Sequence, residues 1–337
     1  MSDQEGAAAM LELTDVSKRF VKSLDIAAKI AQRFGADVRE EVVHAVDSVS
    51  LSIASGEVVG LVGESGCGKS TLGRIVAGVH APSDGVVKFR GRDISTLTGA
   101  EATDVALKVQ MIFQDPMSSL NPRMRVQDII GEAPVVHGVV KRAEMADYVE
   151  ETMNRVGLDP SYARRYPHQF SGGQRQRIGI ARALAVQPEF LVCDESVAAL
   201  DVSIQAQVLN LFMNLREELD LTYLFISHDL GVVEHLSDRV VIMYLGRIVE
   251  IAQTDALFSE PNHPYTKALL AEVPRLETRR RRFEPVKGEI PSPIDPPSGC
   301  HFHPRCPHAT ERCRVECPVL REIAPDRFAA CHLNDDA

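Results

Sequence analysis

Short blocks of hydrophobic residues, several alternating with polar ones, recur along the chain in the manner of β-strands. The blocks lie at residues 11–16, 44–53, 57–62, 85–90, 109–114, 190–194, 222–227 and 239–245. Hydrophobic residues at helical spacing predict helices at 70–79, 143–156, 174–186 and 203–219. This alternation predicts an α/β fold with a mostly parallel sheet, interrupted by a helical segment at residues 116–188.

Two parts of the chain depart from this alternation. Residues 23–41 carry hydrophobic side chains at helical spacing between the first two strands, which predicts a surface insertion with one amphipathic helix. From residue 256 onward the chain becomes rich in Pro, Arg and Cys, and residues 279–282 and 291–297 have the composition of linkers. We therefore expect a Cys-rich C-terminal extension.

The composition is that of a soluble globular protein. Of 337 residues, 45% are hydrophobic and 25% are charged. The net charge of −10 argues against nucleic-acid binding, which favours a basic surface. No apolar run reaches the roughly 18 residues of a membrane span, and the acidic start lacks the features of a signal peptide. We expect a cytosolic protein whose thiols stay reduced.

Residues 63–71 read Gly-Glu-Ser-Gly-Cys-Gly-Lys-Ser-Thr, which fits the phosphate-loop pattern G-x-x-x-x-G-K-[ST]. The glycines let backbone N–H groups turn inward toward a phosphate, and the following helix directs its positive end there. Lys69 can reach the β and γ oxygens, and the Ser70 hydroxyl can bind Mg²⁺. A nucleoside-triphosphate site is therefore predicted, with loop residues Gly63, Ser65, Gly66, Cys67, Gly68, Lys69, Ser70 and Thr71.

Two further segments carry candidate chemistry. The apolar strand at 190–194 ends in Asp194, a suitable Mg²⁺ ligand, and is followed by Glu195, a candidate general base for water. Alone, this acidic pair is typical of a solvated turn, and it gains weight from the phosphate loop. In Phe170-Ser171-Gly-Gly-Gln-Arg-Gln-Arg, Ser171 is predicted to cap a helix that begins near Gly172 and offers free N–H groups to an anion.

Residues 170–177 resemble the signature sequence of ABC ATPases, with Phe170 in place of the usual Leu. Gln114, residues 199–201 and His228 stand where that family has its Q-loop, the loop after the magnesium strand, and its switch histidine. The resemblance implies a P-loop NTPase fold with an ABC-ATPase core, an antiparallel β part and a helical subdomain. It also implies that two such chains pair head to tail around two ATP molecules.

The same resemblance assigns roles to residues. Glu195, His228 and Gln114 would be catalytic, with Gln114 also near the Mg²⁺ held by Ser70 and Asp194. Phe20 would stack on adenine. Ser196 and Ala198 depart from the family pattern without removing a catalytic group. The signature residues that would contact the partner's ATP are Ser171, Gly172, Gly173 and Gln174.

Residues 115–123, 262–270, 288–293 and 298–307 resemble the ATPase subunits of dipeptide/oligopeptide (and nickel) importers. This resemblance implies an ATPase at the cytoplasmic face of the plasma membrane. Its partners would be a second, non-identical ATPase subunit, two permeases and an extracytoplasmic solute-binding protein. The alternatives are another cargo, such as nickel, an opine or an oligosaccharide, and a soluble ABC ATPase outside transport.

Five of the seven cysteines lie between residues 300 and 331. Cys300, Cys306, Cys313 and Cys331 have the spacing C-x5-C-x6-C-x17-C, and in a reducing compartment clustered thiols indicate a metal. Four thiolates suit an iron–sulfur cluster. Zinc would more often show a C-x2-C pair, and free thiols are the third alternative. Some importer ATPases of the resembled family carry a [4Fe–4S] cluster in this extension, which implies the same role for these four positions.

The sequence predicts four parts. A nucleotide-binding core is formed by residues 1–115, with the insertion at 23–41, and continues in residues 189–255. The helical signature subdomain at 116–188 interrupts the core, and the extension of the oligopeptide-transporter type follows at 256–337.

Overall fold

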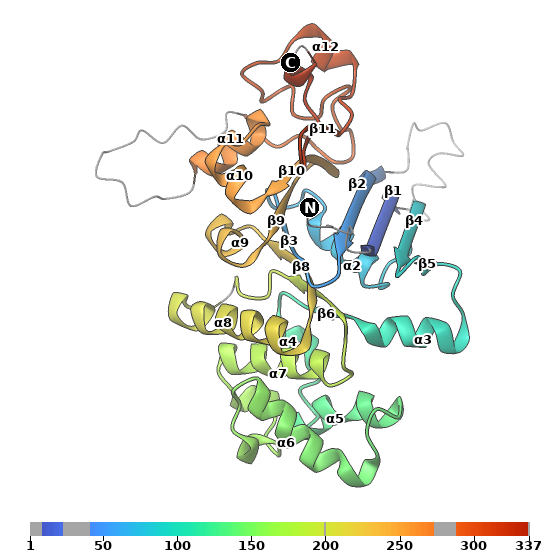
Figure 1. The fold of residues 1–337 in the computed structure, drawn as a ribbon, viewed down its shortest axis with the longest axis vertical. Helices are drawn as coiled ribbons and strands as arrows, with labels where there is room; N and C mark the ends of the chain where they lie inside the picture. Colours follow the sequence, from blue (N-terminus) through green and yellow to red (C-terminus); the bar gives the residue numbers. More distant parts are fainter. Residues whose placement is uncertain (1–8, 23–40, 199, 273–287, 336–337) are drawn as a thin grey trace, which may run out of the picture.

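The computed structural model describes residues 9–22, 41–198, 200–272 and 288–335. The expected helix at 23–40 and the expected linker at 279–282 lie outside these residues. Along the longest axis, the C-terminal residues occupy one end and the strands the middle (Figure 1). The helices α5 (Val126–Val136) and α6 (Met145–Arg155) occupy the other end.

An eight-stranded mixed sheet runs in the order β11-β12-β10-β9-β3-β8-β7-β6. Its parallel part is β9 (Arg239–Tyr244), β3 (Val58–Val62), β8 (Thr222–Ser227), β7 (Phe190–Asp194) and β6 (Val109–Ile112). Strands β3, β7 and β8 are buried throughout, as expected for unbroken apolar runs covered on both faces. The predicted parallel sheet is confirmed for these strands.

The antiparallel strands of this sheet were not foreseen. They are β10 (Arg247–Gln253), β12 (Arg327–Ala329) and β11 (Arg321–Ala324). Because β12 pairs with β10, the C-terminal residues extend the central sheet and are not attached by a linker alone.

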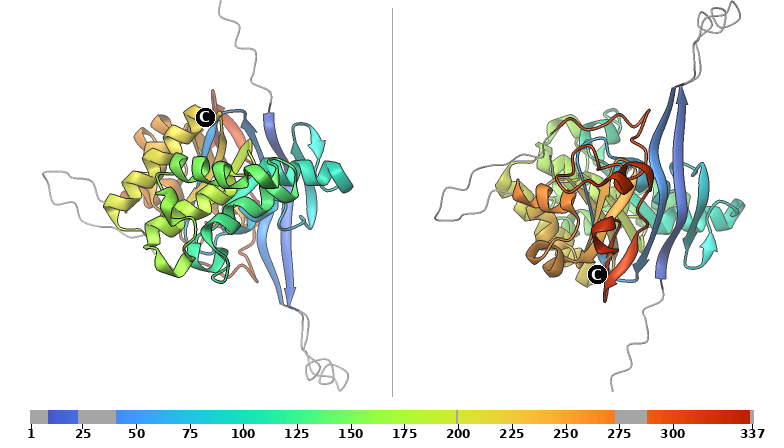
Figure 2. Two further views of the ribbon diagram at one scale, coloured as in Figure 1. Left: turned by 90° about the horizontal axis from the view of Figure 1, so that it is seen from below. Right: turned by 90° about the horizontal axis from the view of Figure 1, so that it is seen from above.

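A second, four-stranded antiparallel sheet has the order β2-β1-β4-β5. Its strands are β2 (Glu41–Ala54), β1 (Ala9–Lys22), β4 (Asp84–Phe89) and β5 (Arg92–Asp93), and it stands beside the helix-covered sheet (Figure 2). Strand β1 is longer than predicted. The alternation of polar and apolar residues breaks at Asp15, where φ is 48° and the register shifts, and the residues from Arg19 to Lys22 are all exposed.

The helices largely follow the predicted periodicity but differ at their ends. The predicted helices correspond to α2 (Lys69–Val76), α6, α7 (Gly172–Leu184) and α8 (Val202–Leu219). The helices α10 (Thr254–Ser259) and α11 (Pro264–Ala271) replace the expected irregular segment, and the expected boundary at 255 falls inside α10. The remaining helical segments are α3 (Gly99–Lys108), α4 (Pro116–Ser119), α9 (Leu230–Leu236), α12 (Glu311–Val315), and the 3-10 turns Arg142–Glu144, Pro160–Tyr162, Pro167–Gln169 and His332–Asn334.

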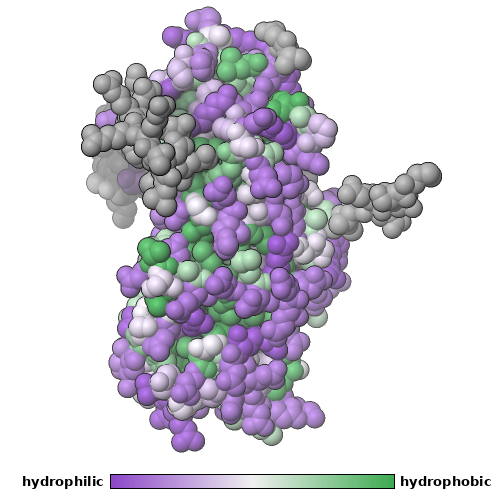
Figure 3. Space-filling view, turned by 60° about the vertical axis from the view of Figure 1, so that its left-hand side comes forward, coloured by the Kyte–Doolittle hydropathy of each residue, from purple (hydrophilic) through white to green (hydrophobic). Residues whose placement is uncertain are grey.

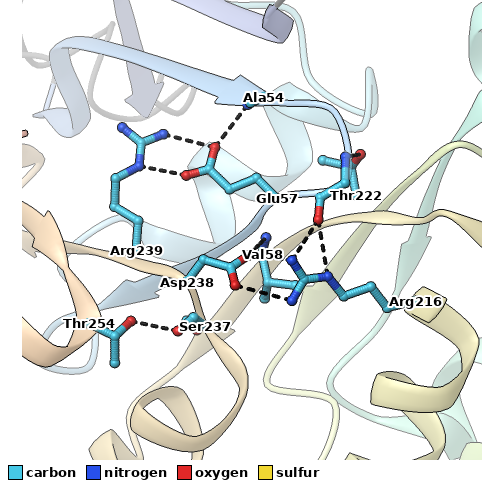
Figure 4. A network of polar contacts seen from close by, with 10 residues as sticks. Ala54, Glu57, Val58, Arg216, Thr222, Ser237, Asp238, Arg239 and Thr254 are labelled. Atoms are coloured by element: carbon cyan, nitrogen blue, oxygen red, sulfur yellow. Dashed lines mark hydrogen bonds and ion pairs between the residues drawn. The ribbon is translucent and has the colours of Figure 1, made fainter. Parts of the chain in front are cut away.

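A polar network fixes the start of β3 (Figure 4). Arg239 Nε lies 2.7 Å from Glu57 Oε1, and Arg216 NH2 lies 2.6 Å from Asp238 Oδ2. The Val58 N–H donates to the same Asp238 oxygen over 2.8 Å. Because these contacts join β3 to α8 and to the start of β9, the strand that leads into the phosphate loop is held at its far end.

The surface is mostly hydrophilic in the view of Figure 3, with hydrophobic side chains in separate patches between polar ones. Among the described residues, no helix is both long enough and apolar enough to cross a bilayer.

Candidate functional site

The phosphate loop connects β3 to α2, which begins at Lys69. Gly68 has φ 108°, and a Cβ atom there would lie 2.0 Å from the Ala45 carbonyl oxygen, so only glycine fits. The Lys69 ammonium donates to the carbonyl oxygens of Gly63, over 2.7 Å, and of Glu64, over 3.0 Å. The lysine side chain therefore lies back along the loop, which is where a bound phosphate would need its charge.

Ser70 and Asp194 meet beside the loop. The Ser70 hydroxyl donates to Asp194 Oδ1 over 2.8 Å. Asp194 is only 2% exposed; this burial raises the pKa of its carboxyl, and the hydrogen bond from Ser70 partly opposes that shift. A hydroxyl and a carboxylate are oxygen donors of the kind that Mg²⁺ prefers. The two side chains therefore fit the predicted magnesium site.

Glu195 contacts Gln114 and His228, which come from two other segments of the chain. It follows β7, Gln114 lies just past β6, and His228 follows β8, so all three are at the carboxyl ends of parallel strands. The Gln114 amide donates to Glu195 Oε2 over 2.6 Å, and His228 Nδ1 lies 3.4 Å from Glu195 Oε1. Glu195 has φ 45°, a strained conformation that is often found at functional sites.

A cavity of about 350 Å³ opens beside Ser70, Gln114 and Glu195, whereas Asp194 and His228 do not line it. Phe20, on the second half of β1, lies at this cavity, and its ring is 39% exposed. The His44 N–H donates to the Pro293 carbonyl over 3.0 Å, which brings the C-terminal residues to the rim. The lining residues are Phe20, Val43, Ala45, Ser65, Gly66, Gly68, Lys69, Ser70, Thr71, Gln114, Glu195 and Pro293.

The structure thus brings together the predicted loop residues with Phe20, Gln114 and Glu195. Sequence reasoning missed Val43, Ala45 and Pro293. Val43 and Ala45 belong to a strand with no phosphate-binding pattern, and Pro293 lies in a segment that showed linker composition and a resemblance to importer ATPases but no sign of nucleotide contact. Their place at the cavity follows from the pairing of β2 with β1 and from the return of the chain after α11, which local patterns do not encode.

Residues 46–198 match the family described as "ABC transporter", and residues 249–313 match "Oligopeptide/dipeptide transporter, C-terminal region". The chain is 51% identical to the oligopeptide transport ATP-binding protein AppF of Bacillus subtilis (strain 168), over 96% of this chain and 97% of that protein. The chain belongs to the ATP-binding proteins of oligopeptide/dipeptide ABC transporters. The family predicted from the sequence motifs is confirmed.

Other relatives agree with this membership. The ABC ATPase is 52% identical to YkfD of the same Bacillus subtilis strain, a putative oligopeptide transport ATP-binding protein, over 89% of this chain and 92% of that one. It is 50% identical to y4tS of Sinorhizobium fredii, a probable peptide ABC transporter ATP-binding protein, over 88% and 84%.

Solved structures show the same fold. The ATP-binding cassette MJ0796, a dimer bound to ADP and Pi in a post-hydrolysis state, is similar with a TM-score of 0.61 and 27% identity, covering 73% of this chain and 99% of that one. CbiO1 of Clostridium perfringens, part of the ABC transporter complex cbiONQ, is similar with a TM-score of 0.61 and 25% identity, covering 75% and 92%. The predicted ABC-ATPase fold, with a mixed sheet and an antiparallel β part, is therefore confirmed.

The signature segment lies away from the cavity. Helix α7 begins at Gly172, and Ser171 caps it: its hydroxyl accepts from the Gln174 N–H over 3.3 Å, and Gln174 Oε1 accepts from the Ser171 N–H over 3.1 Å. The predicted cap is confirmed. A Cβ atom on Gly173 would lie 2.5 Å from Ile204 Cγ2, so α8 requires glycine there. None of residues 171–174 lines the cavity of its own chain.

The C-terminal cysteines do not form a ready metal site. Within the described ranges, no group of three or more His, Cys, Asp or Glu side chains is arranged to hold a metal ion. The thiols are nevertheless neighbours: burial, with smaller contributions from Cys313, Cys331 and Cys306, raises the pKa of Cys300 to about 11. The predicted [4Fe–4S] cluster thus has suitable donors, but this geometry does not support it.

Cys67 and Cys193 are buried in the phosphate loop and in β7. Burial raises the pKa of both thiols, which keeps them protonated. The side chains of both cysteines therefore serve as buried packing groups.

Proposed function

We propose that this chain binds ATP in the 350 Å³ cavity and hydrolyses it to energise the import of peptides. The observation that carries the proposal is the convergence of the phosphate loop with the Ser70–Asp194 pair and with Gln114, Glu195 and His228. Two of the relatives above are named for oligopeptide transport and one for peptide transport. Their similarity, which extends over most of this chain, supports peptides as the cargo.

Nucleotide binding is assigned to the following groups. Backbone N–H groups between residues 65 and 71 and the Lys69 ammonium would hold the phosphates. Ser70 and Asp194, with Gln114 close by, would hold Mg²⁺, which when bound neutralises charge on the phosphate oxygens. The exposed ring of Phe20 would pack against adenine. The Phe20 ring itself lies edge to face with the His80 ring, with 5.8 Å between the two ring centroids.

Hydrolysis is assigned to Glu195 and its neighbours. The Glu195 carboxylate would accept a proton from the water that attacks the γ-phosphate. Gln114 donates to Glu195 Oε2, so Oε1, which lies 3.4 Å from His228 Nδ1, would face that water. His228, whose side chain is half exposed and lies 3.4 Å from Glu195, would contact the γ-phosphate.

The partners follow from the incompleteness of the site within one chain. Residues Ser171, Gly172, Gly173 and Gln174 point to no nucleotide of their own chain, so we assign them to the ATP of a second, homologous ATPase subunit paired head to tail. The free N–H groups at the start of α7 suit that role. We further propose two permeases, which would dock on the helical part at 116–188, an extracytoplasmic binding protein, and a location at the cytoplasmic face of the plasma membrane.

We propose the same division of the chain that the sequence suggested: core at 1–115 and 189–255, helical subdomain at 116–188, and extension at 256–337. Asp115 caps α4, which begins at Pro116, and residue 189 lies between α7 and β7, so two boundaries fall between elements. The third falls inside α10 and belongs nearer residue 253, where β10 ends.

No cofactor step is assigned to Cys300, Cys306, Cys313 and Cys331, because the described residues do not form a metal site. Metal analysis after anaerobic purification separates the alternatives. A brown protein with about four irons per chain would establish an iron–sulfur cluster. A stoichiometric zinc content would establish a zinc site, and a metal-free protein with four reactive cysteines would establish free thiols.

Reconstitution tests the function. The chain would be co-expressed with candidate permeases, a second ATPase subunit and a binding protein, and the complex placed in vesicles with peptide on the side of the binding protein. We expect uptake of peptide that requires ATP on the side of this chain, and loss of uptake in a Lys69→Ala variant. Nucleotide binding without peptide uptake would refute the cargo. Absence of nucleotide binding would refute the ATPase itself.

A further inference from the structure

An arginine from the C-terminal residues reaches into the phosphate loop. Arg305 NH1 and NH2 lie 2.7 Å and 2.9 Å from the two carboxylate oxygens of Glu64, the second residue of the loop. The contact is bidentate, the geometry in which arginine binds carboxylates most strongly. The Arg305 side chain is only 4% exposed, so water barely screens the pair.

The core holds Arg305 in this place. The Arg305 N–H donates to the Phe302 carbonyl over 3.0 Å, in a turn that begins at Cys300. The Phe302 ring packs against Tyr244 and Tyr265, with centroids 5.3 Å and 5.4 Å apart. The Tyr265 hydroxyl in turn accepts from the Glu64 N–H over 2.9 Å. Both the backbone and the side chain of Glu64 are thus fixed by residues that lie some two hundred positions later in the chain.

The charge of Glu64 makes this contact relevant to ATP. The loop is built to hold phosphates, and Lys69, which would bind their oxygens, donates to the Glu64 carbonyl itself. The Glu64 side chain does not line the cavity, so it acts on the phosphates by its charge and through the loop backbone; an uncompensated carboxylate there would repel them. Arg305 is the cation that compensates it.

We propose that Arg305 is a positioning residue for ATP: it neutralises Glu64 and fixes the entry of the phosphate loop, so that the C-terminal residues set the affinity for nucleotide. The inference rests on the proposed function, because it concerns the same ATP site. It adds that an element outside the sequence motifs of that site controls it.

The test is equilibrium binding of MgATP to the full chain, with four variants. Arg305→Met should weaken binding at least about tenfold, which corresponds to about 1.4 kcal/mol. Glu64→Gln alone should leave binding unchanged or tighten it, because it removes the negative charge and leaves the Arg305 cation beside the loop. The double variant Glu64→Gln/Arg305→Met should return to within about threefold of the wild type. Arg312→Met is the matched control, since Arg312 pairs with Glu316 on the surface of the same extension.

The pattern of the four variants decides the outcome. Unchanged binding by Arg305→Met would overturn the proposal. Failure of Glu64→Gln to restore binding would also overturn it, because a packing defect is indifferent to the charge of Glu64. If Arg305→Met does not fold, Arg305→Gln takes its place: it keeps a hydrogen-bond donor for Glu64 but removes the charge, so binding should again weaken at least about tenfold, and unchanged binding in folded protein would refute charge compensation. Failure of the wild type to bind ATP would instead refute the proposed function.

Discussion

Replacing Glu195 with Gln separates ATP binding from ATP hydrolysis in this site. Glutamine has the same shape as glutamate, and both contacts of Glu195 can survive. The new amide oxygen can accept from Gln114, now 2.6 Å from Oε2, while the new NH2 group faces His228 Nδ1, now 3.4 Å from Oε1. The fold and the phosphate loop should therefore be preserved, but an amide cannot accept the proton of the attacking water.

The size of the effect follows from that lost proton acceptor. A positioned general base contributes roughly 10²- to 10⁴-fold in rate, or about 3–5 kcal/mol of activation free energy at 1.36 kcal/mol per tenfold. We expect phosphate release by the assembled transporter to fall by at least about a hundredfold. The affinity for MgATP should be unchanged or higher, because the substitution removes a negative charge beside the phosphates.

The assay compares steady-state phosphate release with equilibrium binding of MgATP in the same preparation. Glu218→Gln is the matched control. The Glu218 carboxylate lies on the surface, 2.9 Å from Arg155 Nε, and does not line the cavity. It should leave both quantities unchanged. Phosphate release by Glu195→Gln above about a tenth of the wild-type rate would show that the base lies elsewhere, because a tenth is above the range for a lost general base.

Three further substitutions test other parts of the site. Ser171→Ala removes the cap of α7 and lowers the free energy of unfolding by about 1 kcal/mol. ATP binding to one chain should persist, while ATP-dependent pairing of two ATPase subunits, measured by size exclusion, should weaken. Unaltered pairing would contradict the signature role. Asp194→Asn should raise the melting temperature of the nucleotide-free protein by about 2 °C or more, because burial raises the pKa of this carboxyl and so disfavours its ionised form. The same substitution should abolish the stabilisation by MgATP, and a melting temperature that MgATP still raises would refute the magnesium site. Phe20→Ala should raise the Kd for ATP about threefold to tenfold, in keeping with an aromatic contact of about 1 kcal/mol, whereas Phe20→Trp should retain wild-type affinity. An unchanged Kd in Phe20→Ala would show that the ring does not contact the base.

The elements that the sequence predicted correctly share a local cause. The unbroken apolar runs at 57–62, 190–194 and 222–227 became the buried strands β3, β7 and β8, because a strand covered on both faces needs no polar alternation. The Ser171 cap was predictable because it depends on residues only three positions apart. Helix α3 was missed because it has few hydrophobic residues at regular spacing. Strand β10 was missed because it follows directly on another apolar strand, β9.

The candidate site could be predicted residue by residue but not as an arrangement. Spacing identified Lys69 and Ser70, and the end of an apolar strand identified Asp194. His228 was assigned only through the resemblance to ABC ATPases. Their distances depended on the order of β3, β8 and β7 in one parallel sheet, which brings the carboxyl ends of the strands to one edge. No pattern indicated Pro293 at the cavity, because the chain reaches it only after leaving the core and returning.

The sequence by itself determined that this protein binds a nucleoside triphosphate and belongs to the ABC ATPases, because a phosphate loop and a helix cap are short-range devices that a few neighbouring residues specify completely. The tertiary structure decided what surrounds that loop. Arg305 and Glu64 are ordinary charged residues in the sequence, and their bidentate contact arises only because the C-terminal residues join the central sheet through β12 and insert Phe302 among the aromatic rings of the core. Pairing across such separations depends on which surfaces remain to be buried once the local elements have formed, and that is a property of the whole fold.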